Sequence, residues 1–378
     1  MIYFDNAATS GKKPQNVINA VDFALKNMSA NPGRSGHSLS AKTADAVYKS
    51  REKVSRFFGG GGGENVIFTL NCTQSINYVL KGVLKKGDRV VVSNLEHNAV
   101  MRPLKKMGIN FDIAEITDDT ETTLQNIKDK IKVNTRLVLM TGASNVTGTI
   151  LPIAEIGKIC KQRGVLFCVD AAQIAGVLPI DMEKMNIDFL CVAAHKGLYA
   201  PMGIGILIAR KNIENTIIEG GTGSSSIDFA QPDVLPEKFE SGTINVPAIL
   251  GVSAGIDFIN SKGIENIYKH EFMLLERLYN SLSLNKNIIL YTKPPVYNFT
   301  APVLPFNVVG KESGETAGIL NEYGIAVRSG LHCAPTAHKV IGTLPYGCVR
   351  VSFGVFNTLS ETDKLINVLK DKKFAKNL

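Results

Sequence analysis

The sequence contains no tryptophan, and aromatic residues make up only 7% of its 378 residues. Proteins that bind nucleic acid usually gather basic residues into a stripe beside aromatic side chains that stack on bases. Here the net charge of +8 is mostly scattered along the chain. Solvated surface charge is the simplest interpretation, although the positive charge would also attract a phosphorylated ligand or an acidic partner protein. We therefore expect no nucleic-acid partner.

Long apolar runs are also missing. The longest, at residues 189–194 and 204–209, fall far short of the roughly 18 residues needed to span a bilayer. The first nine residues have neither the basic region nor the apolar region of a signal peptide. With 44% hydrophobic and 20% charged residues, the composition excludes a disordered chain. We expect a cytoplasmic protein of two or three domains that does not contact a membrane.

None of the six cysteines forms a Cys-x-x-Cys pair, so the sequence predicts neither a disulfide framework nor a zinc knuckle. Cys160, Cys168 and Cys191 stand in apolar or helical contexts and are expected to be small buried hydrophobic residues. Cys333 differs because it stands in a polar segment with a glycine, Arg-Ser-Gly-Leu-His-Cys-Ala-Pro. It is a candidate reactive thiol.

Residues 64–210 alternate apolar runs with amphipathic stretches, which predicts an α/β domain around a mostly parallel sheet of seven strands. The runs are apolar throughout, as expected for strands covered on both faces. The predicted strands are 66–69, 89–93, 110–116, 137–141, 165–169, 189–193 and 204–209. The predicted helices include 41–58 before this region and 74–84, 124–131 and 153–163 within it.

The five glycines at 59–63 invite comparison with a phosphate-binding loop, but no Gly-Lys-Ser/Thr follows them. A connector between a helix and a strand is the better interpretation.

After residue 255 the pattern indicates a smaller α+β domain. Its expected helices are 264–282, 313–323 and 360–369, and its expected strands are 287–291, 303–308, 326–328 and 348–352. We predict an N-terminal segment of residues 1–13, a large domain of residues 14–254 and a small C-terminal domain of residues 255–378 that carries Cys333.

Polar residues follow four of the predicted strands in the large domain. In open α/β sheets, ligands bind just beyond the carboxyl ends of the strands. A single aspartate after a strand is often only a helix cap, but four polar strand ends together favour a binding crevice. The residues are His97, Asn145, Asp170 with Gln173, and His195 with Lys196.

Lys196 and Asp170 suggest pyridoxal phosphate as the cofactor. Its aldehyde needs a lysine amine for a Schiff base, and its pyridine nitrogen needs a carboxylate that keeps it protonated. A lysine that follows an apolar strand can be desolvated, which makes its amine nucleophilic. The cofactor phosphate needs backbone amides at a helix N-terminus, and residues 71–74, between a predicted strand and helix, supply them.

With these residues in place, the chain resembles the cysteine desulfurase and selenocysteine lyase branch of the class V, fold-type I pyridoxal-phosphate enzymes. The resemblance covers nearly the whole chain, and it depends on eight short motifs in the family's order rather than on any one of them. It runs from the motif at residues 3–9 to residues 356–358. Between them, the eight motifs cover residues 31–37 (Asn-Pro-Gly-Arg34-Ser-Gly-His), 96–98, 144–148, 169–173, 195–197, 240–243, 327–334 and 349–352.

The resemblance implies a role for each matching residue. Lys196 would bind the cofactor covalently, Asp170 would pair with its ring nitrogen, and His97 would stack on the ring and take part in proton transfer. Asn145 and Gln173 would bond the ring's phenolic oxygen. Arg350, with Asn145, would bind the substrate carboxylate, and Cys333 would be the catalytic nucleophile. The phosphate ligands would be Cys72, Thr73, His195 and, from the partner subunit, Thr243.

Three positions depart from the family pattern. Ala193 and Cys72 replace a usual serine and threonine, which removes hydroxyl contacts to the phosphate and bears on cofactor affinity. Leu331 replaces a frequent histidine before His332. None of the three changes touches Lys196 or Asp170.

The expected reaction is the conversion of L-cysteine to L-alanine, with a persulfide formed on Cys333. The loop at residues 330–335 is short, which resembles the branch that passes sulfur to a dedicated acceptor protein. The resemblance also implies a homodimer. Selenocysteine lyase remains open as an alternative, as does another class V aminotransferase or epimerase in which Cys333 is not catalytic. Outside catalysis, the alternatives are a cofactor-binding regulator or a basic RNA-binding protein, but the intact set of lysine, aspartate and arginine, with no added binding domain, argues against both.

Overall fold

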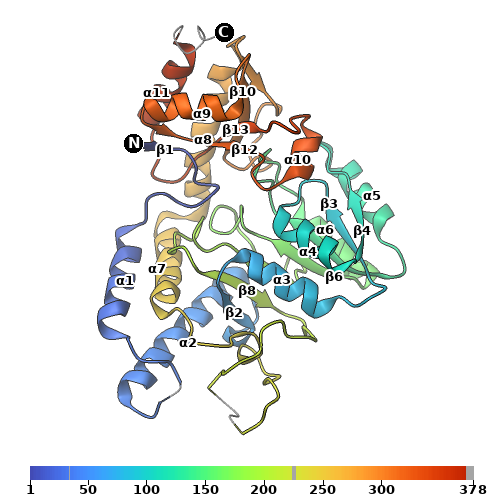
Figure 1. Ribbon diagram of the computed structural model, residues 1–378, viewed down its shortest axis with the longest axis vertical. Helices are drawn as coiled ribbons and strands as arrows, with labels where there is room; N and C mark the ends of the chain where they lie inside the picture. The colour runs from blue at the N-terminus through green and yellow to red at the C-terminus, as the bar shows by residue number, and fades with distance from the viewer. Residues whose placement is uncertain (34, 224–226, 372–378) are drawn as a thin grey trace.

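The computed structural model describes residues 1–33, 35–223 and 227–371 (Figure 1). Its centre is a seven-stranded sheet in the order β2-β8-β7-β6-β5-β3-β4. β8 runs opposite to the other six strands, which are parallel to one another, so the predicted mostly parallel α/β sheet is confirmed. The strands are β2 (Val66–Thr69), β3 (Arg89–Ser93), β4 (Asn110–Ala114), β5 (Thr135–Thr141), β6 (Leu166–Asp170), β7 (Phe189–Val192) and β8 (Gly205–Ala209).

Helices cover both faces of this sheet, which explains why its strands are apolar throughout. Successive side chains of a strand point to opposite faces. Val90 and Val92 therefore pack in the core cluster that includes α3 (Cys72–Val83) and α4 (Asn98–Met107). Val91 packs in the opposite cluster, which includes α6 (Ile153–Arg163). Helix α5 (Thr120–Lys130) packs beside β4.

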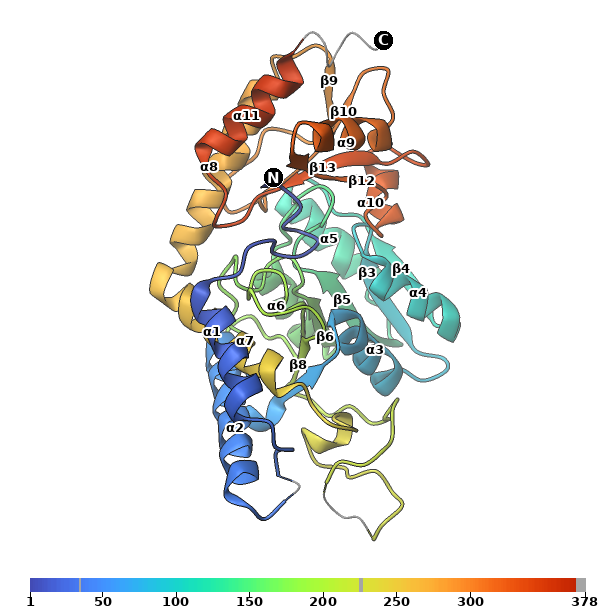
Figure 2. The same cartoon turned by 60° about the vertical axis from the view of Figure 1, so that its left-hand side comes forward.

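Three long helices form one side of the large domain (Figure 2). They are α1 (Gln15–Asn27), α2 (Ser38–Phe58) and α7 (Val246–Lys262), and α7 packs on both of the others. Helix α2 is capped by Gly59, whose φ of 67° is left-handed, so the glycine run begins as a helix cap and connector, as predicted. In α7, a side chain at Gly255 would lie 1.9 Å from the carbonyl oxygen of Leu198, so glycine lets the helix touch the turn that follows Lys196.

The C-terminal part contains a four-stranded antiparallel sheet in the order β12-β13-β10-β9. Its strands are β9 (Ile288–Leu290), β10 (Val303–Val308), β12 (Arg328–Gly330) and β13 (Cys348–Ser352), and its helices are α8 (Ile264–Leu282), α9 (Ser313–Glu322), α10 (Pro335–Val340) and α11 (Leu359–Lys370). The strand expected at residues 326–328 is divided. Its first part, β11 (Ile325–Ala326), pairs with β1 (Ile2–Tyr3), and β12 pairs with β13. The N-terminal segment is therefore attached to the C-terminal elements.

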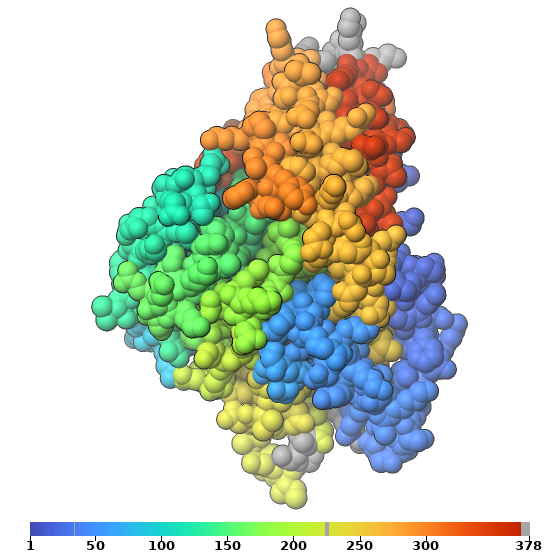
Figure 3. All heavy atoms as spheres, turned by 180° about the vertical axis from the view of Figure 1, so that it is seen from behind, coloured from blue at the N-terminus to red at the C-terminus, as the bar shows by residue number. Residues whose placement is uncertain are grey.

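Helix α8 connects the two ends of the molecule. Seen from behind, the yellow-to-orange segment runs from the N-terminal helices in blue to the C-terminal elements in red (Figure 3). We propose the division into residues 1–13, 14–254 and 255–378 as domains; the last boundary falls within α7. No helix in the described ranges combines the length and the apolar character that a membrane span requires.

Candidate active site

Asp170 ends β6 at the carboxyl edge of the large sheet and is only 4% exposed. Its Oδ1 accepts hydrogen bonds from the backbone nitrogen of Ala172 at 2.9 Å and from the thiol of Cys72 at 3.4 Å. Both bonds end on Oδ1, and Oδ2 accepts no hydrogen bond from the residues that the structure describes. The thiol of Cys72, the first residue of α3, faces this carboxylate.

Lys196 lies in the turn after β7 and lines a cavity of about 180 Å³ together with Gln173 and Glu271. Burial lowers the pKa of its ammonium group, and the neighbouring charge of Asp170 opposes this shift. Arg350 and Arg328 lower the pKa further. A larger share of the amine is therefore unprotonated at neutral pH, as a nucleophilic lysine requires.

His97 stands at the N-cap of α4, directly after β3 and its turn. Its Nδ1 accepts a hydrogen bond from the backbone nitrogen of Ala99 at 3.0 Å, which leaves the proton of the neutral ring on Nε2. Burial lowers the pKa of this imidazole, so the neutral form is favoured. The charge of Asp170 opposes this shift, whereas that of Lys196 adds to it.

His195 contributes a buried ring nitrogen, Nδ1, that has no hydrogen-bond partner among the described residues. Burial lowers the pKa of the ring to about 4, so it is neutral at physiological pH. The first two residues of α3, Cys72 and Thr73, carry backbone amides that a helix cannot satisfy internally. An unpartnered ring nitrogen and a helix N-terminus are both suited to an anion such as a phosphate.

Asn145 connects two parts of the site. Its side-chain Nδ2 donates to the backbone carbonyl of His332 at 2.8 Å, and its backbone carbonyl accepts from Nη1 of Arg350 at 3.0 Å. Gln173 donates from Nε2 to the carbonyl of Ala7 at 3.1 Å. The two amide side chains thus hold the cysteine loop and the N-terminal segment against the large sheet.

Arg350 lies in β13 and is 1% exposed. Its Nη2 donates to Asp5 at 2.6 Å, and its Nε is buried without a partner among the described residues. Burial lowers the pKa of the guanidinium, and the charge of Asp5 opposes that shift. The sequence singled out Arg350 but not Asp5, although Asp5 stands inside one of the quoted motifs and an acidic residue is what a buried arginine needs.

Cys333 is exposed, whereas the other five cysteines are buried, as expected for Cys160, Cys168 and Cys191. Its Sγ lies 4.0 Å from Nη2 of Arg328, and its carbonyl accepts from the backbone nitrogen of Asn98 at 2.7 Å. Asn98 is the residue after His97, so the cysteine loop lies against the start of α4.

Thr243 does not line the cavity beside Lys196. It is exposed and accepts a hydrogen bond from Nδ2 of Asn31 at 3.4 Å. Arg34, in the motif that begins at Asn31, lies outside the described residues.

Glu96 is a buried carboxyl group that sequence reasoning did not assign. Its Oε1 accepts from the hydroxyl of Ser93 and from the backbone nitrogen of Thr141, which joins the ends of β3 and β5. Burial raises its pKa to about 8, so the group is mostly protonated at neutral pH. Its place directly after a strand, beside His97, was the signal available in the sequence.

The fold and this site define an α/β protein in which a lysine, an aspartate and two histidines meet at the carboxyl edge of a mostly parallel sheet. Residues 2–365 match the family model described as "Aminotransferase class-V". The chain therefore belongs to the aminotransferase class V family.

Similar proteins include two from archaea, each described as a probable cysteine desulfurase. The Pyrococcus abyssi protein is 35% identical, over 98% of this chain and 94% of that protein. The protein from Methanothermobacter thermautotrophicus is 34% identical with the same coverage. Among solved structures, the apo cysteine desulfurase from Thermococcus onnurineus NA1 aligns with a TM-score of 0.89 and 34% identity, covering 100% of this chain and 95% of that one. The cysteine desulfurase CsdA from Escherichia coli aligns with a TM-score of 0.87 and 25% identity, with the same coverage.

Proposed function

We propose that the protein binds pyridoxal 5'-phosphate at the carboxyl edge of the large sheet. The residues present fit this cofactor: the free Oδ2 of Asp170 suits a protonated ring nitrogen, and the unpartnered Nδ1 of His195 suits a phosphate. Lys196 would hold the cofactor covalently, with Cys72 and Thr73 at its phosphate. His97 would stack on its ring, and Asn145 and Gln173 would lie beside its phenolic oxygen. When bound, the cofactor supplies an electron sink for charge that develops on the substrate's Cα.

The proposed substrate is L-cysteine. Arg350 would bind its carboxylate, because a buried guanidinium with an unpartnered Nε has a hydrogen-bond donor to offer. The displaced amine of Lys196, or His97, would move the Cα proton, since both groups favour their neutral form. Asn145 holds both Arg350 and the cysteine loop, so carboxylate binding and nucleophile placement share one support.

Sulfur transfer would take place at Cys333. Its thiolate attacks Sγ of the substrate, a sulfur–sulfur bond forms, and the carbon–sulfur bond breaks with its electron pair left on the substrate carbon. Protonation of that carbon yields L-alanine, and Cys333 retains the transferred sulfur as a persulfide. The step is balanced without an external oxidant. The guanidinium of Arg328, 4.0 Å from Sγ, is suited to stabilise the thiolate.

The observation that carries this proposal is the exposed thiol of Cys333 held beside Arg328 while every other cysteine is buried. Aminotransferase or epimerase chemistry would need Lys196 and Asp170 but not this thiol. Incubation with L-cysteine and a thiol reductant should release alanine and sulfide in equal amounts. Formation of a keto acid or of D-cysteine without alanine would contradict the proposal.

We further propose a cytoplasmic homodimer that passes sulfur to an acceptor protein. Six free cysteines suit a reducing compartment. The exposed position of Thr243, away from the cavity at Lys196, is compatible with a contact to the partner subunit's phosphate site. Sedimentation of the active enzyme tests the dimer, and a fully active monomer would exclude it.

A further inference from the structure

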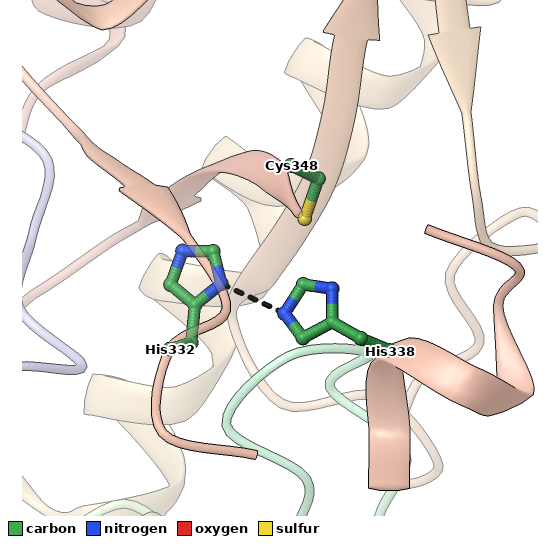
Figure 4. A group of neighbouring side chains, drawn as sticks. All are labelled: His332, His338 and Cys348. Atoms are coloured by element: carbon green, nitrogen blue, oxygen red, sulfur yellow. Dashed lines mark hydrogen bonds between the residues drawn. The ribbon is translucent and has the colours of Figure 1, made fainter. Parts of the chain in front are cut away.

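Two buried histidines lie directly behind the cysteine loop. His332 precedes Cys333, and His338 lies in α10, with exposed fractions of 3% and 0%. Their ring planes are nearly parallel, at 9°, and Nδ1 of His332 is 3.1 Å from Nε2 of His338 (Figure 4). Cys348 points toward the same place from β13 (Figure 4). None of these three residues has a place in the proposed chemistry.

The outer nitrogen of each ring also has a polar neighbour. Nδ1 of His338 lies 2.6 Å from the hydroxyl oxygen of Thr343, and Nε2 of His332 lies 3.5 Å from the carbonyl oxygen of Arg328. Since a carbonyl can only accept, Nε2 of His332 must carry the proton, and its Nδ1 must accept from Nε2 of His338. Nδ1 of His338 then accepts from the hydroxyl of Thr343. In this direction both neutral rings are paired. The reverse direction would have the Thr343 hydroxyl donate to the backbone carbonyl of His338 at 3.4 Å and would leave an unprotonated Nε2 of His332 facing the carbonyl of Arg328.

Both rings are neutral at any working pH. Burial and the charge of Arg350 lower the pKa of His332 to about 2 and that of His338 to about 4. The same positive charge disfavours a metal cation between the rings, although the nitrogens and Sγ of Cys348 lie within 4.8 Å of one another. The inner nitrogens already share a hydrogen bond, which a metal would have to replace.

The loop that these rings support has an unfavourable backbone. His332 and Cys333 have φ values of 49° and 57°, a left-handed conformation that residues other than glycine rarely adopt. Such a conformation persists where its surroundings hold it, and it is often found at functional sites. The side chain of His332 reaches inward to Arg328, and the guanidinium of Arg328 reaches outward to the thiol of Cys333.

We propose that Thr343, His338 and His332 form a one-directional hydrogen-bond relay that holds the left-handed turn at Cys333 and keeps its thiol beside Arg328. The three are positioning residues, since they act through the loop and contact neither substrate nor cofactor. This inference rests on the proposed role of Cys333, but the placement of the thiol can be measured without substrate.

The test compares Thr343→Val, which removes the hydroxyl at similar volume, with Thr343→Ser, which retains it. Cys333 is the exposed cysteine, so alkylation by iodoacetamide reports on its thiol. In Thr343→Val we expect alkylation at pH 7 to slow about three- to tenfold, because the thiolate loses the nearby positive charge. Thr343→Ser should restore the wild-type rate. The kcat for alanine formation should fall, and the KM for L-cysteine should not change.

Cys348→Ala is the matched control. It lies in the same cluster but takes no part in the relay, so its alkylation profile should equal that of the wild type. Histidine nitrogen NMR of the whole protein should show both His332 and His338 protonated on Nε2, a readout that also serves if the Thr343 variants do not fold.

Three results would overturn the relay. The first is an unchanged alkylation profile in a folded Thr343→Val protein. The second is either histidine protonated on Nδ1. The third is a stoichiometric metal that Cys348→Ala releases, which would make the cluster a metal site. If the relay results hold but no alanine forms from L-cysteine, the proposed function fails and the relay does not.

Discussion

Asp5 and Arg350 join the two ends of the chain, with Oδ1 of Asp5 2.6 Å from Nη2 of Arg350. The arginine is 1% exposed, so this carboxylate compensates a charge that water cannot reach. A substrate carboxylate that docked on Arg350, as we propose, would therefore meet a guanidinium whose charge is already partly neutralised. The N-terminal segment would thereby influence the affinity of the proposed substrate site.

Asp5→Asn should lower the stability of the folded protein and increase its affinity for the substrate. The amide retains an oxygen acceptor but removes the charge, and leaving a buried charge without its partner costs about 3 kcal/mol. We expect a loss of that order in the free energy of unfolding, measured with urea, and a severalfold lower KM for L-cysteine. A substrate carboxylate should restore part of the lost stability.

Asp363→Asn is the control for this prediction, because its ion pair with Arg277 is exposed. It should change the free energy of unfolding by less than about 1 kcal/mol and leave KM unchanged. A higher KM in Asp5→Asn would instead mean that the aspartate orients the arginine and that its charge matters less.

Reduction with borohydride should fix the cofactor on Lys196. The holoenzyme should be yellow and lose its colour on reduction, and the peptide that contains Lys196 should gain the cofactor's mass. Lys13 is the competing amine, since burial lowers its pKa to about 8. Lys13→Ala should remain yellow, whereas Lys196→Ala should not trap the cofactor. Labelling at Lys13 in the wild type would refute the assignment of Lys196.

The pH dependence of stability should reveal Glu271, a carboxyl group of α8 that is 3% exposed and lines the cavity beside Lys196. Burial raises its pKa to about 8, above the 4.5 of an exposed glutamate. Between these values the folded protein holds a proton that the unfolded chain releases, so this group's contribution to stability falls as the pH rises toward 8.

The glutamine of Glu271→Gln is neutral at every pH. The free energy of unfolding of this variant, relative to that of the wild type, should therefore be a few kcal/mol higher at pH 9 than at pH 5. The measurement is urea unfolding at both pH values. Glu276→Gln, on the exposed side of the same helix, should show no such gain. If the free energies of unfolding of Glu271→Gln and the wild type differ by the same amount at pH 5 and at pH 9, Glu271 is ionised in the folded protein.

The sequence predicted the parts of this molecule that depend on local pattern. Helix α6 and strands β10 and β13 have the expected bounds, because apolar periodicity alone determines them. It also predicted that Asp170 and Lys196 would share one edge, since consecutive parallel strands end together.

Contacts between distant segments could not be predicted in this way. The pairing of Asp5 with Arg350 spans 345 positions, and the strand expected at 326–328 is divided because β1 pairs with its first half. The thiol of Cys72 likewise faces Asp170 through packing that no spacing reveals. Such contacts depend on how the N-terminal segment and the C-terminal sheet meet the large domain.

Cys333→Ala separates sulfur transfer from the other reactions that this family's scaffold supports. Cofactor binding should be unchanged, because no described contact of Asp170, His195 or Lys196 involves the thiol of Cys333. Binding of L-cysteine should persist too, because Arg350 and Asn145 keep their hydrogen bonds. Alanine formation should fall by about a thousandfold or more, as expected when a covalent nucleophile is removed.

The measurement is the rate of alanine formation from L-cysteine at equal cofactor occupancy, with Cys160→Ala as the control. Cys160 is buried in α6, remote from the loop in sequence, and its loss should leave the rate within about twofold of the wild type. Selenocysteine should be less affected by Cys333→Ala, since its carbon–selenium bond is weaker. Equal rates for the wild type and Cys333→Ala with L-cysteine would make the exposed thiol a bystander, because a reaction that proceeds without it needs no persulfide. The site of Lys196, Asp170 and Arg350 would then serve a different reaction on an amino-acid substrate.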